Sequence, residues 1–215
     1  MNADKYTLIK RYTLIIPKSM ILFLIVLLFA VNWNSEAQIF ELGPVVGYGE
    51  IGDGPFLPFR YCNAYKYNNF VRTGISGNLS FKSSAISLKT GITYNQILNS
   101  TSESLYHLKF MQLPVGFDLR MGKKFYGLAG TGIVINSTFK KSTHLIKYPA
   151  FQLGLSANLG LGYSINKRMN INLEYQYEYN ITALYATRYR GVYEESRSIN
   201  RIFYVNLKIR ISKNT

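Results

Sequence analysis

The stretch Phe-Tyr-Val-Asn-Leu-Lys-Ile-Arg-Ile at residues 203–211 decides the fold class of this chain. Every second residue is apolar, and the residues between them are Tyr204, Asn206, Lys208 and Arg210. A helix would need apolar residues three or four positions apart, whereas the side chains of a strand alternate between its two faces. The stretch therefore predicts a β-strand with one apolar face and one polar face.

The same alternation recurs along the chain and predicts eight strands in all. It is clear in the segments 71–81, 84–97, 109–121, 151–164, 169–180 and 203–212. Two further segments, 40–50 and 125–139, have the composition of strands, but their phase is harder to assign. The 18 Tyr and 13 Phe residues support this interpretation, because aromatic side chains are favoured on pleated surfaces. After residue 37, no segment has the ~20 consecutive apolar residues of a membrane-spanning helix.

The connections between these segments alternate in length. Long connections lie near 51–69, 98–105, 139–149 and 182–199, and short ones lie at 82–84, 122–124 and 166–168. In an up-and-down meander, the long loops then share one end of the barrel, and both termini share the other end with the short turns. Short periplasmic turns and long extracellular loops are typical of outer-membrane barrels. We therefore predict an all-β fold, an eight-stranded antiparallel up-and-down transmembrane β-barrel with both termini in the periplasm.

The alternative is a soluble barrel of the lipocalin type, with an apolar interior and a polar outer surface. The predicted polar face consists mainly of Gly, Ser, Thr, Asn and Gln, whereas a water-facing surface carries more charges. Small polar groups suit the narrow interior of eight strands. The apolar face also ends in tyrosines such as Tyr175, Tyr177 and Tyr179, which suit a membrane–water interface. We expect the apolar face to contact lipid.

The few charges on the polar face have both signs, so we expect them to form a network that closes the lumen. Glu174 and Glu178 lie on one predicted strand and Lys208 and Arg210 on the next, which predicts pairing between adjacent strands. The other expected members are Arg72, Lys89, Asp118 and Arg120. Paired charges are tolerated in a closed interior, while unpaired ones are costly. The alternative is a proton or ion path, which the small diameter disfavours.

The N-terminus has the pattern of a secretory signal peptide. Basic residues precede an apolar run at 20–31, and Ser35-Glu36-Ala37 follows, which predicts cleavage between Ala37 and Gln38. We therefore divide the chain into a signal peptide at 1–37 and a barrel domain at 38–215. The alternative is an uncleaved inner-membrane anchor, for which the apolar run is short.

Together these features resemble the PorT-like small outer-membrane β-barrel family of Bacteroidetes. Two places carry the resemblance: the junction Ser35-Glu36-Ala37-Gln38, and residues 108–115, where an apolar residue precedes Pro114 in a strand. The resemblance covers about residues 38–215 and implies a place in the outer membrane of a Gram-negative envelope. Founding members of that family are linked to a secretion system. The resemblance assigns no functional residue in this chain. The chain departs from outer-membrane barrels in general because residues 211–215 lack a terminal aromatic residue.

No pattern in the sequence indicates a catalytic, cofactor or metal site. His107 and His144 fall in or beside long loops without a triad or HExxH signature, and Cys62 is the single cysteine. We expect no enzyme activity, and a lipid-modifying enzyme using His107 is the least favoured alternative. The net charge is +14, yet the basic residues form no dense run, so we expect no nucleic-acid partner.

The long loops are the remaining candidates for function. The first and fourth contain Tyr and Arg residues, a mixture typical of binding surfaces. The candidate contacts are Tyr61, Tyr65, Tyr185, Tyr189, Arg190 and Tyr193. We expect them to contact outer-membrane lipid and lipopolysaccharide, or a partner protein of the envelope, in a monomeric barrel. The alternative function is transport, as a small pore or a component of a secretion machine.

Overall fold

The computed structural model describes residues 38–55, 66–81, 85–99, 108–139, 146–183, 185–189 and 192–211. The predicted signal peptide at 1–37 lies outside these residues. Within the described ranges, no helix has the length and apolar character needed to cross a membrane.

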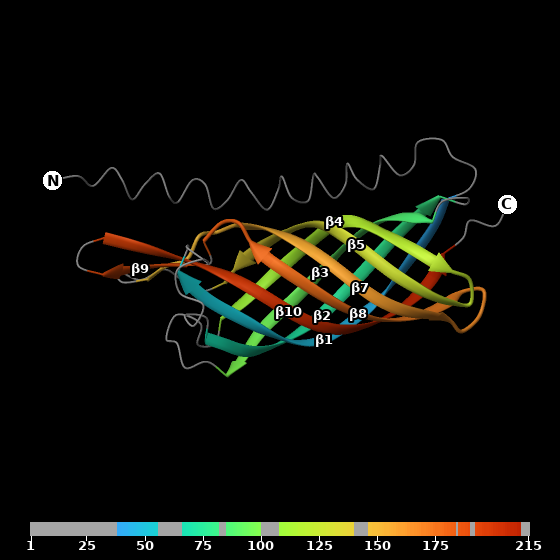
Figure 1. The fold of residues 1–215 in the computed structure, drawn as a ribbon, viewed down its shortest axis with the longest axis horizontal. Helices are drawn as coiled ribbons and strands as arrows, with labels where there is room; N and C mark the ends of the chain where they lie inside the picture. The colour runs from blue at the N-terminus through green and yellow to red at the C-terminus, as the bar shows by residue number, and fades with distance from the viewer. Residues whose placement is uncertain are drawn as a thin grey trace. The chain divides into compact units, whose positions relative to one another are not determined.

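Eight long antiparallel strands form a closed barrel (Figure 1). They are β1 (Gln38–Pro55), β2 (Lys66–Phe81), β3 (Ile86–Asn99), β4 (Lys109–Gly122), β5 (Phe125–Thr138), β7 (Gln152–Ser164), β8 (Met169–Asn180) and β10 (Val192–Ile211). Each pairs with the next, and β1 pairs with β10 to close the sheet. The predicted eight-stranded up-and-down barrel is confirmed.

Two short strands extend the sheet where the sequence predicts only loops. β9 (Tyr185–Tyr189) pairs with the first residues of β10, and β6 (Ile146–Lys147) pairs with β9. Figure 1 shows that β9 and the start of β10 project beyond one end of the barrel. The prediction that 182–199 is a loop is therefore wrong for most of this segment. Hydrogen bonds between β9 and β10 pair the backbone groups of this segment in a hairpin. In the sequence, Gly191 lies between the two strands, and glycine favours hairpin turns.

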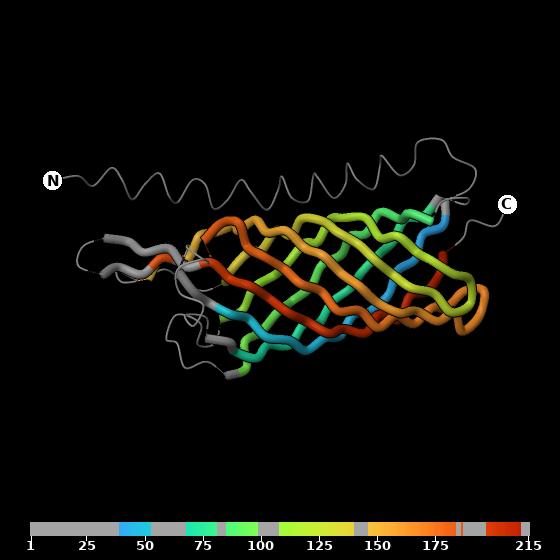
Figure 2. The backbone as a smooth tube through the Cα atoms, viewed as in Figure 1, coloured from blue at the N-terminus to red at the C-terminus, as the bar shows by residue number. Residues whose placement is uncertain are grey.

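The first long connection is also shorter than predicted. β1 continues to Pro55 and β2 begins at Lys66, so the strands take up residues at both ends of the predicted 51–69 loop. The two barrel ends are distinct. The end with the tight turns also holds the start of β1 and the end of β10, and we call it the turn end (Figure 2). The opposite end, where β1 ends and β2 begins, is the loop end.

The apolar face points outward and the polar face points into the barrel, as predicted. On the outside, Phe117, Leu159 and Phe203 are each exposed by 59–66%. In the interior, Glu174 and Asn206 have no exposed surface. This burial is the reverse of that in a soluble barrel and matches a barrel surrounded by lipid.

The structure also assigns the phase of the two ambiguous strands. In β1, Leu42, Val46 and Tyr48 point outward and are exposed, while Val45 is buried. In β5, Phe125 is exposed and Tyr126 is buried. Polarity could not reveal these phases, because the inward residues Val45 and Tyr126 are themselves apolar or aromatic.

Candidate functional site in the barrel lumen

Glycines on β5 and β7 make room for large polar side chains in the lumen. A Cβ at Gly130 would lie 2.2 Å from the Asp118 Oδ1 atom, and one at Gly160 would lie 2.7 Å from Glu174 Cγ. A Cβ at Gly162 would meet the Tyr126 ring at 2.1 Å. One wall of the interior is thus built from backbone, and the side chains of the other strands fill the space in front of it.

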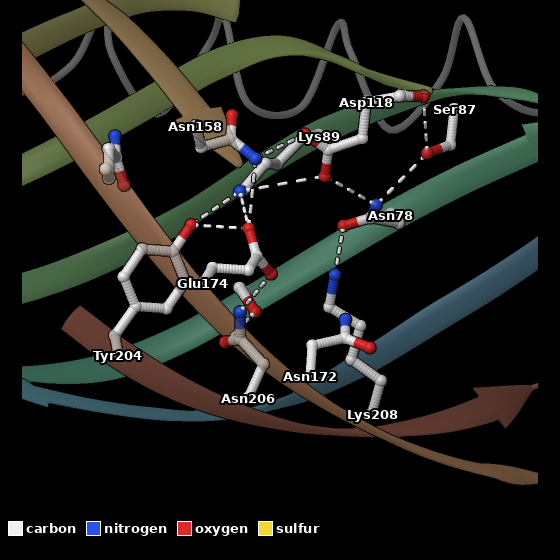
Figure 3. Close-up of polar contacts among 12 residues, drawn as sticks. Asn78, Ser87, Lys89, Asp118, Asn158, Asn172, Glu174, Tyr204, Asn206 and Lys208 are labelled. Atoms are coloured by element: carbon white, nitrogen blue, oxygen red, sulfur yellow. Dashed lines mark hydrogen bonds and ion pairs between the residues drawn. The ribbon is translucent and has the colours of Figure 1, made fainter. Parts of the chain in front are cut away.

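Glu174 on β8 is the centre of an inner network of charges (Figure 3). Lys89 Nζ lies 2.7 Å from Glu174 Oε2 and 3.6 Å from Asp118 Oδ2. The Tyr204 hydroxyl donates to Glu174 Oε2 at 2.6 Å and accepts from Lys89 Nζ at 2.7 Å. These four residues come from β3, β4, β8 and β10, so the network crosses the lumen.

Asparagine amides complete the inner network. Asn158 Nδ2 donates to both Glu174 and Asp118 at 3.1 Å, and Asn206 Nδ2 donates to Glu174 Oε1 at 2.9 Å. Asn78 Nδ2 donates to Asp118 Oδ2 at 3.1 Å, while its own oxygen accepts from Lys208 Nζ at 2.8 Å. Lys208 is therefore joined to the carboxylates through Asn78. Hydrogen bonds to buried charges offset the free-energy cost of removing these charges from water.

A second network surrounds Glu178, four residues farther along β8. Arg72 Nη2 lies 2.8 Å from Glu178 Oε1, and Arg72 Nε donates to Asn95 Oδ1 at 2.8 Å. The other carboxylate oxygen accepts from Gln112 at 3.0 Å and from Asn200 at 2.8 Å. Both oxygens of this buried carboxylate are thus paired.

The predicted pairing between β8 and β10 is wrong. The register places Glu174 opposite Tyr204 and Glu178 opposite Asn200, while Lys208 lies opposite Asn170. The carboxylates instead bind Lys89 and Arg72, which lie across the lumen. The sequence could not show this, because contacts across a narrow barrel depend on its stagger and diameter.

Arg210 and Arg120 lie at the turn end, apart from the two networks. Arg210 pairs with Glu41 at 3.1 Å, and Asn170 also donates to Glu41, at 2.8 Å. The Arg120 guanidinium stacks 3.5 Å from the centre of the Tyr126 ring and donates to Ser164 Oγ at 2.9 Å. Arg120 therefore binds neutral groups in the described part of the chain, in place of the carboxylate we expected.

Charges of opposite sign are balanced inside the barrel. Of the predicted residues, Arg72, Lys89 and Lys208 are buried cations, and Asp118, Glu174 and Glu178 are buried anions. Glu41 and Tyr204 also belong to these polar contacts, although neither was predicted to do so. Tyr204 could have been found, since it lies on the polar face of the 203–211 strand, whereas Glu41 lies in a segment without clear phase.

An apolar cluster adds a second kind of filling toward the loop end. Three of its side chains, at most 1% exposed, lie two residues closer to the loop end than members of the Glu178 network on the same strand. They are Phe70 beside Arg72 on β2, Ile97 beside Asn95 on β3, and Phe110 beside Gln112 on β4. The full cluster comprises Val45, Ile51, Phe70, Ile97, Leu108, Phe110, Tyr148, Ile202 and Tyr204. This cluster was not predicted from the sequence. The sequence pattern that could have indicated the cluster is an apolar residue at a position that belongs to the polar face of its strand, as at Phe110 and Ile202.

Half of the six predicted loop contacts lie outside what the structure describes. Tyr61, Tyr65 and Arg190 are among the residues not described, as are His107, His144 and Cys62. Tyr185 and Tyr189 belong to β9, and Tyr193 belongs to the first part of β10, in the projecting hairpin. In the described ranges, no group of three His, Cys, Asp or Glu side chains is arranged to hold a metal ion.

Comparisons with known proteins agree with this geometry. The family described as outer membrane protein beta-barrel domain matches residues 21–195, and the chain belongs to this family. It is therefore an integral β-barrel of the outer membrane. No curated protein matches the sequence.

Solved structures of small barrels have a similar fold. Neisserial surface protein A (NspA) gives a TM-score of 0.50 at 12% identity, over 80% of this chain and 97% of that chain. The outer membrane protein OprG from Pseudomonas aeruginosa gives a TM-score of 0.51 at 14% identity, over 82% of this chain and 97% of that chain. At these identities the similarity shows the fold alone.

Proposed function

We propose that this outer-membrane barrel has a closed, non-conducting lumen and acts as a structural or interaction protein through its loop end. The observation that carries the proposal is the filled interior. Two hydrogen-bonded charge networks and the apolar cluster, which shares Tyr204 with the inner network, together fill the lumen along its length. Interaction at the loop end then involves lipid, lipopolysaccharide or an envelope protein, and the barrel is a monomer without enzyme activity.

Several features support the rest of this proposal. Export by a signal peptide at 1–37, cleaved between Ala37 and Gln38, would leave a chain that begins where β1 begins. Both ends of the barrel sequence lie at the turn end, which suits a periplasmic location for the termini. The Ala37-Gln38 junction and residues 108–115 support a place among the PorT-like barrels of Bacteroidetes.

Planar-bilayer conductance tests the closed lumen. We expect the refolded wild-type protein to give no stable conducting state, since ordered side chains fill its interior. A variant with Phe70→Ser, Arg72→Ser, Lys89→Ser, Phe110→Ser, Glu174→Ser and Glu178→Ser removes side chains from both charge networks and from the apolar cluster. We expect it to raise the ion leak, provided that heat-modifiable migration shows a folded barrel.

A stable conducting state of the wild-type protein would overturn the closed lumen and favour the alternative, a small pore. The variant shows that the bilayer assay detects a small opening in this same barrel. Folding of both proteins is checked in the same detergent before the measurement.

A further inference from the structure

The turn end carries exposed basic side chains that take no part in closing the lumen. Lys123 and Lys124 form the turn between β4 and β5, and Lys167 and Arg168 lie in the turn between β7 and β8. All four residues are exposed. We call these four residues the basic arc.

The two turns of the basic arc are neighbours in space. Because β5 pairs with β7, the Ser164 amide donates to the Lys124 carbonyl at 2.8 Å. The Arg210 amide donates to the Arg168 carbonyl at 2.7 Å, which joins the second turn to β10. Figure 2 shows the yellow-green turn and the orange turn side by side at one end of the barrel. The four basic residues therefore lie on neighbouring turns of the turn end.

Acidic side chains do not neutralise this surface in the described part of the chain. The segments 119–126 and 164–170, which contain both turns, have no Asp or Glu. Glu41 lies at the same end, but its side chain is 9% exposed and is already paired with Arg210. The basic arc thus keeps its positive charge toward the surroundings.

The outer face next to the basic arc is apolar. Phe125, Tyr163 and Ile165 are exposed by 66%, 40% and 48%. Lys124 Nζ lies 5.6 Å from the centre of the Tyr163 ring, so this lysine spans the border between the aromatic surface and water. Lipid headgroups lie at such a border, with acyl chains on the apolar side.

We propose that the basic arc binds the headgroups of anionic phospholipids in the leaflet at the turn end. Lysine and arginine form charge-assisted hydrogen bonds with phosphate, and juxtamembrane basic clusters attract anionic lipid. Phe125 and Tyr163 lie below the charges, where they contact the acyl chains. This site is at the opposite end from the loops of the proposed function, so either conclusion stands without the other.

Electron paramagnetic resonance of spin-labelled lipids tests the proposal. The refolded barrel is placed in phosphatidylcholine bilayers that contain spin-labelled phosphatidylglycerol or spin-labelled phosphatidylcholine. The immobilised fraction gives the relative association constant for each lipid at the barrel surface. We expect phosphatidylglycerol to bind about fivefold more strongly than phosphatidylcholine, which corresponds to the attraction of about one basic residue to an anionic membrane. We also expect this preference to fall in high salt, because salt screens the charges.

Two variants with equal loss of charge locate the effect. Lys124→Gln, Lys167→Gln and Arg168→Gln together remove most of the basic arc, and we expect them to abolish the preference. Lys109→Gln, Lys147→Gln and Arg201→Gln remove three exposed charges elsewhere on the barrel and should leave most of it. Equal losses in both variants would overturn the proposal in favour of a general effect of net charge. Equal binding of the two lipids by the wild-type protein would overturn it without any variant.

Discussion

Glu174 shows how strongly one residue of the lumen depends on its neighbours. Its side chain accepts hydrogen bonds from Lys89, Tyr204, Asn158 and Asn206, and it is fully buried. Removing one member of a buried ion pair leaves the other charge without compensation, which costs about 3–5 kcal/mol. The network therefore makes the stability of the barrel sensitive to single changes.

We expect Glu174→Gln to lower the free energy of unfolding by about 3 kcal/mol, the lower end of that range, because Lys89 loses its 2.7 Å partner and keeps Asp118 at 3.6 Å. Urea unfolding of the refolded barrel in lipid vesicles measures the change. The control is Glu41→Gln, whose partner Arg210 has a side chain that is 30% exposed, so we expect a loss of about 1 kcal/mol or less. Adding Lys89→Met to Glu174→Gln should recover part of the loss. Similar losses at Glu174 and Glu41 would contradict this account.

The sequence predicted which charges lie in the lumen better than it predicted their partners. Lys89, Asp118 and Glu174 were identified because strand alternation assigns a side chain to one face. Their contacts depend on which strands lie across the lumen, and this information is absent from the alternation. Phe110 and Ile202 were missed for a related reason, since an apolar residue at an inward position does not disturb the pattern enough to be noticed.

At the scale of elements, the seam between β1 and β10 closes the barrel. The strands pair from Phe40↔Ile211 at the turn end to Pro55↔Ser196 at the loop end. The seam is tight at Gly43, where an added Cβ would lie 1.6 Å from the Leu207 carbonyl oxygen. No side chain fits there unless one strand moves.

We expect Gly43→Ala to destabilise the folded barrel by about 3 kcal/mol, the upper end of the range for overpacked sites. The matched control is Gly127→Ala on β5, where the nearest atom to an added Cβ is Met121 Cε at 3.8 Å. Heat-modifiable migration and urea unfolding compare the two variants. A Gly43→Ala barrel as stable as the Gly127→Ala barrel would show that the strands of the seam move apart to admit a methyl group.

The sequence located both ends of β7 and β8, and the last residue of β10, to within one residue, since polar and apolar side chains alternate there without interruption. It did not locate β9 or the first residues of β10. β9 pairs with the first residues of β10 and with β6, outside the closed barrel, so no barrel interior imposes an alternation on these residues. Gly191 is a local signal of a turn, because glycine adopts the backbone conformations that hairpin turns require.

At the scale of the whole molecule, the orientation in the membrane decides which end meets the exterior. The alternation of long and short connections and the shared position of both termini favour loops outside and turns in the periplasm. The single cysteine, Cys62, lies between β1 and β2 in the sequence, in the first long loop.

We expect a membrane-impermeant maleimide to label Cys62 in intact cells, because the proposed orientation exposes the loops to the medium. A Cys62→Ser variant that also carries Lys123→Cys moves the thiol to the turn end and should be labelled only after lysis. Mass spectrometry of the purified protein measures the labelled fraction. Labelling of Lys123→Cys but not of Cys62 in intact cells would reverse the orientation.

The contacts of the lumen also constrain the order in which the barrel forms. Glu41 binds Arg210, which is 169 residues away, and Ser76 binds Asn206 across 130 residues. Before the last strand arrives, Glu174 lacks Tyr204 and Asn206, and Glu178 lacks Asn200. A partly built sheet would therefore bring incompletely satisfied carboxylates into hydrocarbon, where unpaired charges are costly. Insertion and closure must accordingly proceed together, with the final strand completing the charge pairing as the barrel enters the bilayer.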